Sequence, residues 1–239
     1  MKVVLLTTDT LHHLYFSTML SETDCLAGVV LEAPAQGPEF STFHSFEAMR
    51  DEYEKSYFFK ETVPTFSDLA HTHETRSVND VLTRDWITQI RPELILVFGT
   101  QRLLDEVISL PSHACLNLHG GNPELYRGLD SHYWSIYHYD FENLITTLHH
   151  IDKNYDSGPL VSSKAISIFS NMGIHQLRAA NTETCLELFT EAFESLVSGR
   201  GITSLPQKQM GRYYSAMPGV LKGDCKKKFE TFTQRIPEH

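Results

Sequence analysis

The sequence predicts an α/β fold in which helices cover both faces of a mostly parallel sheet. Short apolar runs alternate with segments of helical length over residues 1–160. Parallel strands require such crossover segments, which are usually helices. With 239 residues, of which 41% are apolar and 21% are charged, the chain is large enough for one domain with a substantial core.

Four apolar runs in the first half of the chain, rich in β-branched residues and leucine, are typical of buried strands. They lie at residues 2–8, 26–32, 93–98 and 114–119, and helices are expected at residues 11–21, 46–57, 78–90 and 103–108. Ser77 is expected to cap the third of these helices, and Pro92 is expected to end it. Residues 64–74 are expected to be irregular.

The second half should continue with a short aromatic helix after Asp130 and two strands at residues 144–151 and 159–168. In the helix that follows, apolar side chains between Cys185 and Leu196 recur at i, i+3, i+4 and i+7, and Gly199 ends the pattern. A basic helix is expected at residues 222–233. These elements predict a Rossmann-like main domain at residues 1–199 and a short basic appendage at residues 200–239.

Charge is unevenly distributed along the chain. The formal net charge is −10, yet residues 200–239 contain eight Lys or Arg against three Asp or Glu. Because affinity for nucleic acid requires clustered positive charge, the acidic remainder disfavours a nucleic-acid partner. The basic appendage is expected to contact an anionic substrate or to form the interface of a homodimer.

Neither the cysteines nor the N-terminus indicates export or a structural metal. The four cysteines are widely spaced and form no CxxC pair, which argues against a zinc ribbon and a disulfide framework. His71 and His73 lack a third placed ligand, so no metal is expected. The first residues contain only four consecutive strongly apolar side chains, too few for a signal peptide or a membrane span. We therefore expect a cytoplasmic protein without a membrane partner.

The residues best suited to chemistry follow the strands at 114–119 and 144–151. In open parallel sheets, ligands bind beyond the carboxyl ends of the strands. Asn117 and His119 lie on the same side of their strand because side chains alternate, and Asp156 lies in a turn just before Ser157 and Gly158. An amide, an imidazole and a carboxylate suit acyl transfer without a covalent intermediate, because they can polarise a carbonyl, accept a proton and orient the base.

The segments at residues 117–128 (NLHGGNPELYRG) and 147–158 (TLHHIDKNYDSG) resemble the 10-formyltetrahydrofolate-dependent formyltransferase family. This family includes glycinamide ribonucleotide formyltransferase, methionyl-tRNA formyltransferase and the nucleotide-sugar N-formyltransferases. The likeness extends over residues 1–169 as a pattern and is sharp over residues 94–160. One departure lies at residues 121–123 (GNP), where family members often have a serine and two leucines before a proline.

The resemblance implies that Asn117, His119 and Asp156 are the catalytic residues, with Asp156 holding His119 in the useful tautomer. It also implies that 10-formyltetrahydrofolate is the co-substrate and that no metal takes part. Folate contacts are implied for Phe98, Gly99, Thr100, Gln101, Arg102, Leu103, Leu104 and Asp152. Contacts with a small amine substrate are expected from His12, Gly120, Gly121, Tyr126, Arg127, Trp134, His149 and Tyr213.

The His-Gly after Asn-Leu and the Tyr-Arg-Gly resemble the amino-sugar enzymes of the family more than the purine enzyme. The expected acceptor is therefore a nucleotide-linked amino sugar, of the kind used in lipopolysaccharide O-antigen, bound through aromatic rings and cations. Transfer to tRNA is expected to be disfavoured, because about forty residues follow Gly199 and the chain is acidic. Three alternatives stay open: a formyltetrahydrofolate hydrolase, formyl transfer to glycinamide ribonucleotide or another small amine, and a non-enzymatic folate or nucleotide binder.

Overall fold

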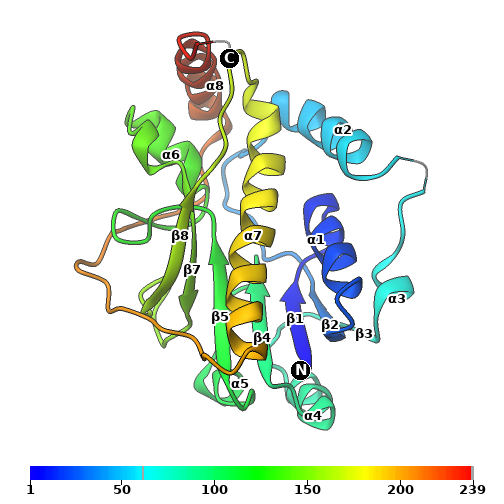
Figure 1. The fold of residues 1–239 in the computed structure, drawn as a ribbon. Helices are drawn as coiled ribbons and strands as arrows, with labels where there is room; N and C mark the ends of the chain where they lie inside the picture. The colour runs from blue at the N-terminus through cyan, green and yellow to red at the C-terminus, as the bar shows by residue number, and fades with distance from the viewer. Residues whose placement is uncertain (61, 238–239) are drawn as a thin grey trace.

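The computed structural model describes residues 1–60 and 62–237 and has a seven-stranded sheet at its centre (Figure 1). The strands lie in the order β3-β2-β1-β4-β5-β7-β8. Their bounds are β1 Val3–Thr7, β2 Leu26–Glu32, β3 Thr72–Thr75, β4 Leu94–Phe98, β5 Ala114–His119, β7 Ile145–His150 and β8 Leu160–Ala165. Strands β1 to β5 pair in parallel, whereas β7 is antiparallel to β5 and β8 is antiparallel to β7. The predicted mostly parallel sheet is confirmed.

The helices lie close to the positions expected from the sequence. They are α1 Leu11–Ser21, α2 Phe46–Phe58, α4 Val81–Ile90, α5 Asp105–Ile108, α6 Ser131–Tyr137, α7 Leu177–Val197 and α8 Gly219–Thr233. The first of them has the predicted bounds, and the basic helix α8 begins three residues earlier than predicted. Within residues 1–60 and 62–237, no helix combines the length and the apolarity needed to cross a membrane.

Alternate side chains of the central strands pack against different helices on the two faces of the sheet. Val3 and Leu5 of β1 belong to a buried cluster with residues of α1 and α7. Val4 and Leu6 belong to a separate cluster with residues of α4 and α5. Figure 1 shows α7 running across one face of the sheet near α1, and the two helices are in contact. Helices therefore cover both faces, as expected from the alternation of strands and helices.

The expectation that residues 64–74 are irregular is wrong. They contain the short helix α3 (Phe66–Leu69) and most of β3. The sequence of β3 is Thr-His-Glu-Thr, and the strand lies at the edge of the sheet, where β2 is its neighbour. An edge strand is half solvated, so backbone pairing with β2 holds it in place without an apolar pattern.

The start of α4 also differs from expectation. The N-cap position is occupied by Asp80 rather than Ser77. Val78 is fully buried, and its N–H donates a hydrogen bond of 2.9 Å to the Glu32 carboxylate. The N–H of Asp80 donates to the carbonyl oxygen of Ser77. These contacts hold residues 77–80 in a turn, so the helix begins later than the sequence pattern indicates.

The C-terminal part of the chain packs against the sheet and its helices. β9 (Arg212–Tyr214) pairs in parallel with β6 (Tyr126–Gly128), and strands of three residues are too short to show a pattern. Phe229 of α8 is fully buried in one cluster with Phe46 of α2. The division between a main domain and an appendage stays a prediction, and residues 238–239 of that appendage lie outside the described residues.

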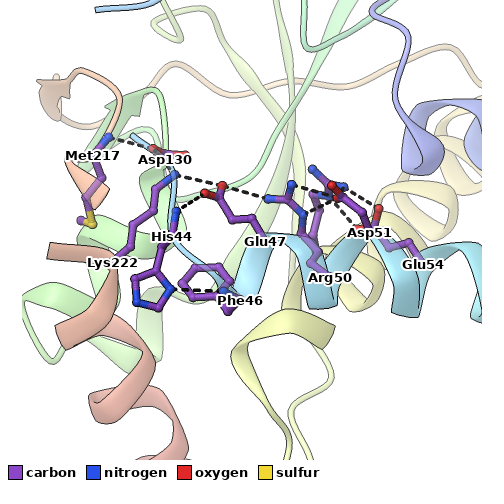
Figure 2. A network of polar contacts seen from close by, with 10 residues as sticks. His44, Phe46, Glu47, Arg50, Asp51, Glu54, Asp130, Met217 and Lys222 are labelled. Carbon is purple, nitrogen blue, oxygen red and sulfur yellow. Dashed lines mark hydrogen bonds and ion pairs between the residues drawn. The ribbon is translucent and has the colours of Figure 1, made fainter. Parts of the chain in front are cut away.

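A network of ion pairs joins α2, α7 and α8 (Figure 2). Glu54 of α2 has no exposed side-chain surface and accepts two hydrogen bonds from the guanidinium of Arg178 in α7. Glu47, two turns earlier in α2, pairs with Arg50 and with Lys222 of α8. Because each of these long side chains needs its partner once water is excluded, the network fixes the three helices relative to one another.

Glu54→Ala is expected to lower the free energy of unfolding by about 3 kcal/mol, because it leaves a partly buried guanidinium without its bidentate partner. Glu52, which is exposed on the same helix, provides the matched control. Glu52→Ala should stay within about 0.5 kcal/mol of wild type. Urea unfolding followed by circular dichroism measures both, and equal effects of the two substitutions would contradict this role of the network.

Candidate active site

A cavity of about 560 Å³ lies at the carboxyl ends of the central strands. Its lining includes Thr8 after β1, Gly99 after β4 and Gly120 after β5. A second cavity of about 60 Å³ shares Asn117 and Asp156 with the first. These two side chains therefore lie at a wall between two spaces, where groups from two different ligands could meet.

The structure brings the three predicted catalytic residues together beside this wall, with His119 on the side of the larger cavity. Asn117 Nδ2 lies 3.3 Å from Asp156 Oδ1, and His119 Nδ1 lies 3.6 Å from the same oxygen. Asn117 and His119 come from the end of β5, whereas Asp156 comes from the loop between β7 and β8. The side chains of His119 and Asp156 are only 7% and 12% exposed. An amide, an imidazole and a carboxylate therefore meet where most water is excluded.

His119 is oriented by the backbone. Its Nε2 lies 2.9 Å from the carbonyl oxygen of Tyr126, and because a carbonyl only accepts, Nε2 carries a proton and donates it. Nδ1 is the nitrogen that faces Asp156. The carbonyl of Tyr126, rather than Asp156 as expected, therefore selects the tautomer, and Nδ1 is left to share or exchange a proton with the carboxylate.

His149 of β7 supports the amide of Asn117. Its Nδ1 donates a hydrogen bond of 2.7 Å to the carbonyl oxygen of His150. In the neutral ring, Nε2 is then the acceptor for Asn117 Nδ2, at 3.1 Å. Nε2 also lies 3.6 Å from Asp156 Oδ1, so a protonated ring faces the carboxylate. The amide of Asn117 thus directs one N–H at His149 and the other at Asp156.

Asp156 is held as a carboxylate. Burial favours its neutral form, but the positive charge of His119 and His149 when they are protonated, and the backbone N–H of Gly128, which lies 2.8 Å from Oδ2, outweigh burial. Together they hold the pKa of Asp156 well below its usual range. The backbone at Asp156 is left-handed, with φ of 49°. This conformation is uncommon for residues other than glycine, although aspartate adopts it more readily than most.

Comparison with known proteins assigns the chain to a family. A family model described as formyl transferase matches residues 46–192. The chain belongs to the formyl transferase family. A methionyl-tRNA formyltransferase from Caldanaerobacter subterraneus subsp. tengcongensis is 27% identical over 137 residues, which are 57% of this chain and 43% of that protein. The chain thus spans less than half the length of this curated relative.

Solved structures share the fold of this chain at low sequence identity. A 4-N formyltransferase from Francisella tularensis has a TM-score of 0.60 and 16% identity, covering 90% of this chain and 76% of that one. The formyltransferase PseJ from Anoxybacillus kamchatkensis, solved with UDP-4,6-dideoxy-4-formamido-L-AltNAc and tetrahydrofolate, has a TM-score of 0.52 and 16% identity, covering 89% and 85%. A HypX variant from Aquifex aeolicus has a TM-score of 0.61 and 17% identity, covering 99% of this chain and 35% of that one.

Most residues predicted to contact folate line a cavity. Seven of the eight do so: Phe98, Gly99, Thr100, Gln101, Arg102, Leu103 and Asp152. Leu104 lines neither cavity. Its side chain is exposed at the start of α5, and its N–H donates to Asn79.

A buried carboxylate anchors the loop after β4. Glu32 is 2% exposed and accepts hydrogen bonds from the N–H of Gln101 at 2.7 Å and of Val78 at 2.9 Å. Gly99 in this loop has φ of 88°, and a Cβ there would lie 2.6 Å from the ring of His13. A glycine is therefore required at this position, and the loop backbone is held at the edge of both cavities.

Half of the residues predicted to contact the amine substrate line a cavity. His12, Gly120 and Tyr213 line the larger one, and His149 lines the smaller one. The other four line neither: Gly121, Tyr126, Arg127 and Trp134.

Internal partners explain why these four lie away from the cavities. The guanidinium of Arg127 donates to the carbonyl oxygens of Tyr155 and Gly211. Trp134 donates its indole N–H to the carbonyl of Ser215, and its ring stacks on Tyr214, as does the ring of Tyr126. At Gly121, a Cβ would lie 2.7 Å from Ser131. These residues support the walls of the site rather than face its open space.

Sequence reasoning missed the part of the larger cavity formed by α2 and α7. Arg50 of α2 lines it together with Arg178 and Asn181 of α7. No local motif marks these residues, because they come near the cavity only when two helices far apart in the sequence pack against each other. The sole available signal was a polar residue on an amphipathic helix, which is common on any protein surface.

Two buried histidines at the start of α1 are neutral. Burial lowers the pKa of His13 to about 3, although its hydrogen bond with the backbone of Thr8 opposes the shift. Burial also lowers the pKa of His12 well below its usual value, and the charges of His13, Arg178 and Arg50 add to this effect. The larger cavity is therefore lined by uncharged imidazoles on the α1 side.

Across residues 1–60 and 62–237, no group of three or more His, Cys, Asp or Glu is arranged to hold a metal ion. His71 and His73, the pair considered from the sequence, both pack against the ring of Trp86.

Asp156→Asn is expected to lower the free energy of unfolding at pH 7. The native pKa of Asp156 lies below the unfolded value of about 3.9, so its stabilisation is fully present above that pH and is lost as the pH falls through the native pKa. The difference in unfolding free energy between wild type and variant should therefore shrink in urea titrations at pH 7, 4 and 2.5. A difference that does not change with pH would contradict the stabilised carboxylate.

Proposed function

We propose that this chain transfers the formyl group of 10-formyltetrahydrofolate to the primary amine of a small acceptor. The observation that carries the proposal is that Asn117 and Asp156 line both cavities and meet His119, which lines the larger one. Transfer between two substrates requires both to reach one set of groups in the correct orientation. Membership of the formyl transferase family supports the same reaction class.

The two substrates are assigned to opposite sides of the wall between these cavities. Folate is assigned to the loop after β4 and to the loop that carries Asp152 and Asp156, which together line the smaller cavity. The acceptor is assigned to the larger cavity, near His12, Asn181 and Tyr213. The formyl carbon would then lie beside Asn117, within reach of an amine from the other side.

In the proposed reaction the acceptor nitrogen forms a bond to the formyl carbon, and the carbonyl oxygen becomes an oxyanion. The amide of Asn117 donates to this oxygen in place of its bond to Asp156, the longer of its two at 3.3 Å. His119 Nδ1 and Asp156 take the proton of the attacking amine. When the intermediate collapses, the bond from the formyl carbon to folate N10 breaks, N10 receives the proton, and tetrahydrofolate is released.

A nucleotide-linked amino sugar is the proposed acceptor. Both guanidinium groups that line the larger cavity are already paired with carboxylates, Arg50 with Glu47 and Asp51, and Arg178 with Glu54 and Asp51 (Figure 2). Among the described residues that line this cavity, no Arg or Lys is left without a carboxylate. This favours uncharged sugar hydroxyls in the cavity and disfavours a phosphate there.

The same reasoning favours an amino sugar over glycinamide ribonucleotide, whose phosphate would need a cation close to the reacting amine. The nucleotide diphosphate of an amino sugar is assigned to the outside of the cavity. PseJ, which shares the fold, was solved with a nucleotide-linked formamido sugar. We place the reaction in the cytoplasm and in the synthesis of formylated sugars such as those of lipopolysaccharide O-antigen, and we propose a homodimer through the C-terminal segment.

Release of tetrahydrofolate from 10-formyltetrahydrofolate tests the proposal. The assay is run without acceptor and with nucleotide-linked 3- and 4-amino sugars, glycinamide ribonucleotide and free amino acids. Release that requires an amino-sugar nucleotide supports the proposal. Release without acceptor would make the protein a hydrolase. Release with glycinamide ribonucleotide alone would make that molecule the acceptor in place of the amino sugar. Folate binding without release under any condition would leave a binding protein.

His119→Ala is expected to lower kcat by about 10²–10⁴, because it removes the imidazole that shares the proton with Asp156. His113 is exposed at the entry to the same strand, so His113→Ala is the matched control and should keep wild-type turnover. Steady-state kinetics and circular dichroism are measured on both variants. Near-normal turnover by a folded His119→Ala protein would contradict the assignment.

A further inference from the structure

The segment at residues 205–214 lies against the turn that carries Asp156. Leu205 exchanges two backbone hydrogen bonds of 2.8 Å with Leu160 at the start of β8. A few residues further on, β9 pairs in parallel with β6, whose last residue, Gly128, donates its N–H to the Asp156 carboxylate. The formyl transferase family model ends at residue 192, so it does not include this segment.

Gln207 makes the direct contact with the turn. Its Nε2 donates hydrogen bonds to the carbonyl oxygens of Asp156 at 2.9 Å and of Gly158 at 3.0 Å. One amide group thus bridges the backbone on both sides of Ser157. The backbone in between includes the left-handed conformation of Asp156. Such a conformation persists when the surrounding structure holds it in place.

The oxygen of the Gln207 amide indicates the role of this contact. Its Oε1 is buried and has no hydrogen-bond partner within the described part of the chain. A buried acceptor without a partner costs free energy, so the two hydrogen bonds that Nε2 donates to the turn must outweigh this cost. Turning the amide over would place Oε1 against two carbonyl oxygens. The side chain therefore gives up one hydrogen bond in order to present its donor to the turn.

We infer that Gln207 is a positioning residue that sets the direction of the Asp156 carboxylate. The inference rests on the role proposed for Asp156. The carboxylate lies 3.3 Å from Asn117 and 3.6 Å from His119, both near the limit of a direct interaction. A shift of the turn by about 1 Å would separate these groups and can lower a rate by about 10²-fold.

Arg127 of β6 also connects the Asp156 turn to the 205–214 segment. Its guanidinium donates to the carbonyl of Tyr155 at 2.8 Å and to that of Gly211 at 3.4 Å. The turn and the 205–214 segment are therefore bridged by two side chains, Gln207 from the segment itself and Arg127 from β6. Gln207 differs from Arg127 because it holds the backbone of Asp156 itself.

Gln207→Leu is the first test, because leucine keeps the approximate volume and removes the donor. We expect kcat to fall about 10- to 100-fold, with less than about a threefold change in KM for folate and acceptor, since most residues that line the two cavities lie outside this turn. Gln209, which is exposed two residues later, provides the matched control. Gln209→Leu should keep wild-type kcat and KM.

The second readout does not depend on activity. NMR titration of the ¹³C-labelled Asp156 carboxyl in the substrate-free protein reports its pKa, which lies well below its usual range in the wild-type structure. In Gln207→Leu the midpoint should rise toward the ordinary value, because the carboxylate moves away from His119, His149 and the N–H of Gly128. A residue that only stabilises the fold would leave this midpoint unchanged.

Gln207→Glu keeps the shape of the side chain and tests the positioning role of Gln207 if Gln207→Leu does not fold. Its ionised carboxylate would face two carbonyl oxygens, so kcat should fall at neutral pH and recover in part at acidic pH, where the protonated acid donates one hydrogen bond. Wild-type kcat and an unchanged Asp156 titration in the folded variants would overturn the inference. A shifted Asp156 titration in a protein that transfers no formyl group would uphold the positioning of Asp156 and overturn only the proposed function.

Discussion

Burial by itself would keep a carboxyl group neutral, yet Asp156 is ionised, and the site is assembled around that charge. Two imidazoles and a backbone N–H outweigh the loss of water around the carboxylate. Each comes from a different place in the fold: His119 from β5, His149 from β7 and Gly128 from β6. The sheet order, which places β7 directly beside β5, allows one carboxylate to reach both imidazoles, whereas Gly128 comes from the separate two-stranded sheet of β6 and β9.

The N–H groups around Asp156 have hydrogen-bond partners before any ligand enters. Both N–H groups of Asn117 already have acceptors, and the Nε2 proton of His119 is held by a carbonyl. A ligand oxygen therefore has to replace an existing hydrogen bond rather than fill an empty position. The exchange is between similar partners in a site with little water, so the groups need little reorganisation when charge develops on the ligand.

Ion pairs, rather than unpaired charges, set the polarity of the larger cavity. Arg50 and Arg178 bring donors to its surface, but Asp51, Glu47 and Glu54 cancel their charge. The same ion pairs connect α2 to α7, and through Glu47 and Lys222 to α8. Through this ion pair, α8 helps to set the shape and polarity of the larger cavity, although none of its residues lines the cavity.

The sequence by itself determined the parallel sheet, most element positions and the catalytic candidates, because these depend on local spacing. Alternation of side chains within β5 puts Asn117 and His119 on one side of the strand, and a short turn sequence marks Asp156. Only the tertiary structure decided that β3 is an edge strand, that a carbonyl sets the tautomer of His119, and that Gln207 reaches the Asp156 turn. The physical reason is that each of these contacts joins segments distant in the sequence. Such contacts arise from packing, which leaves no periodic signal in either segment.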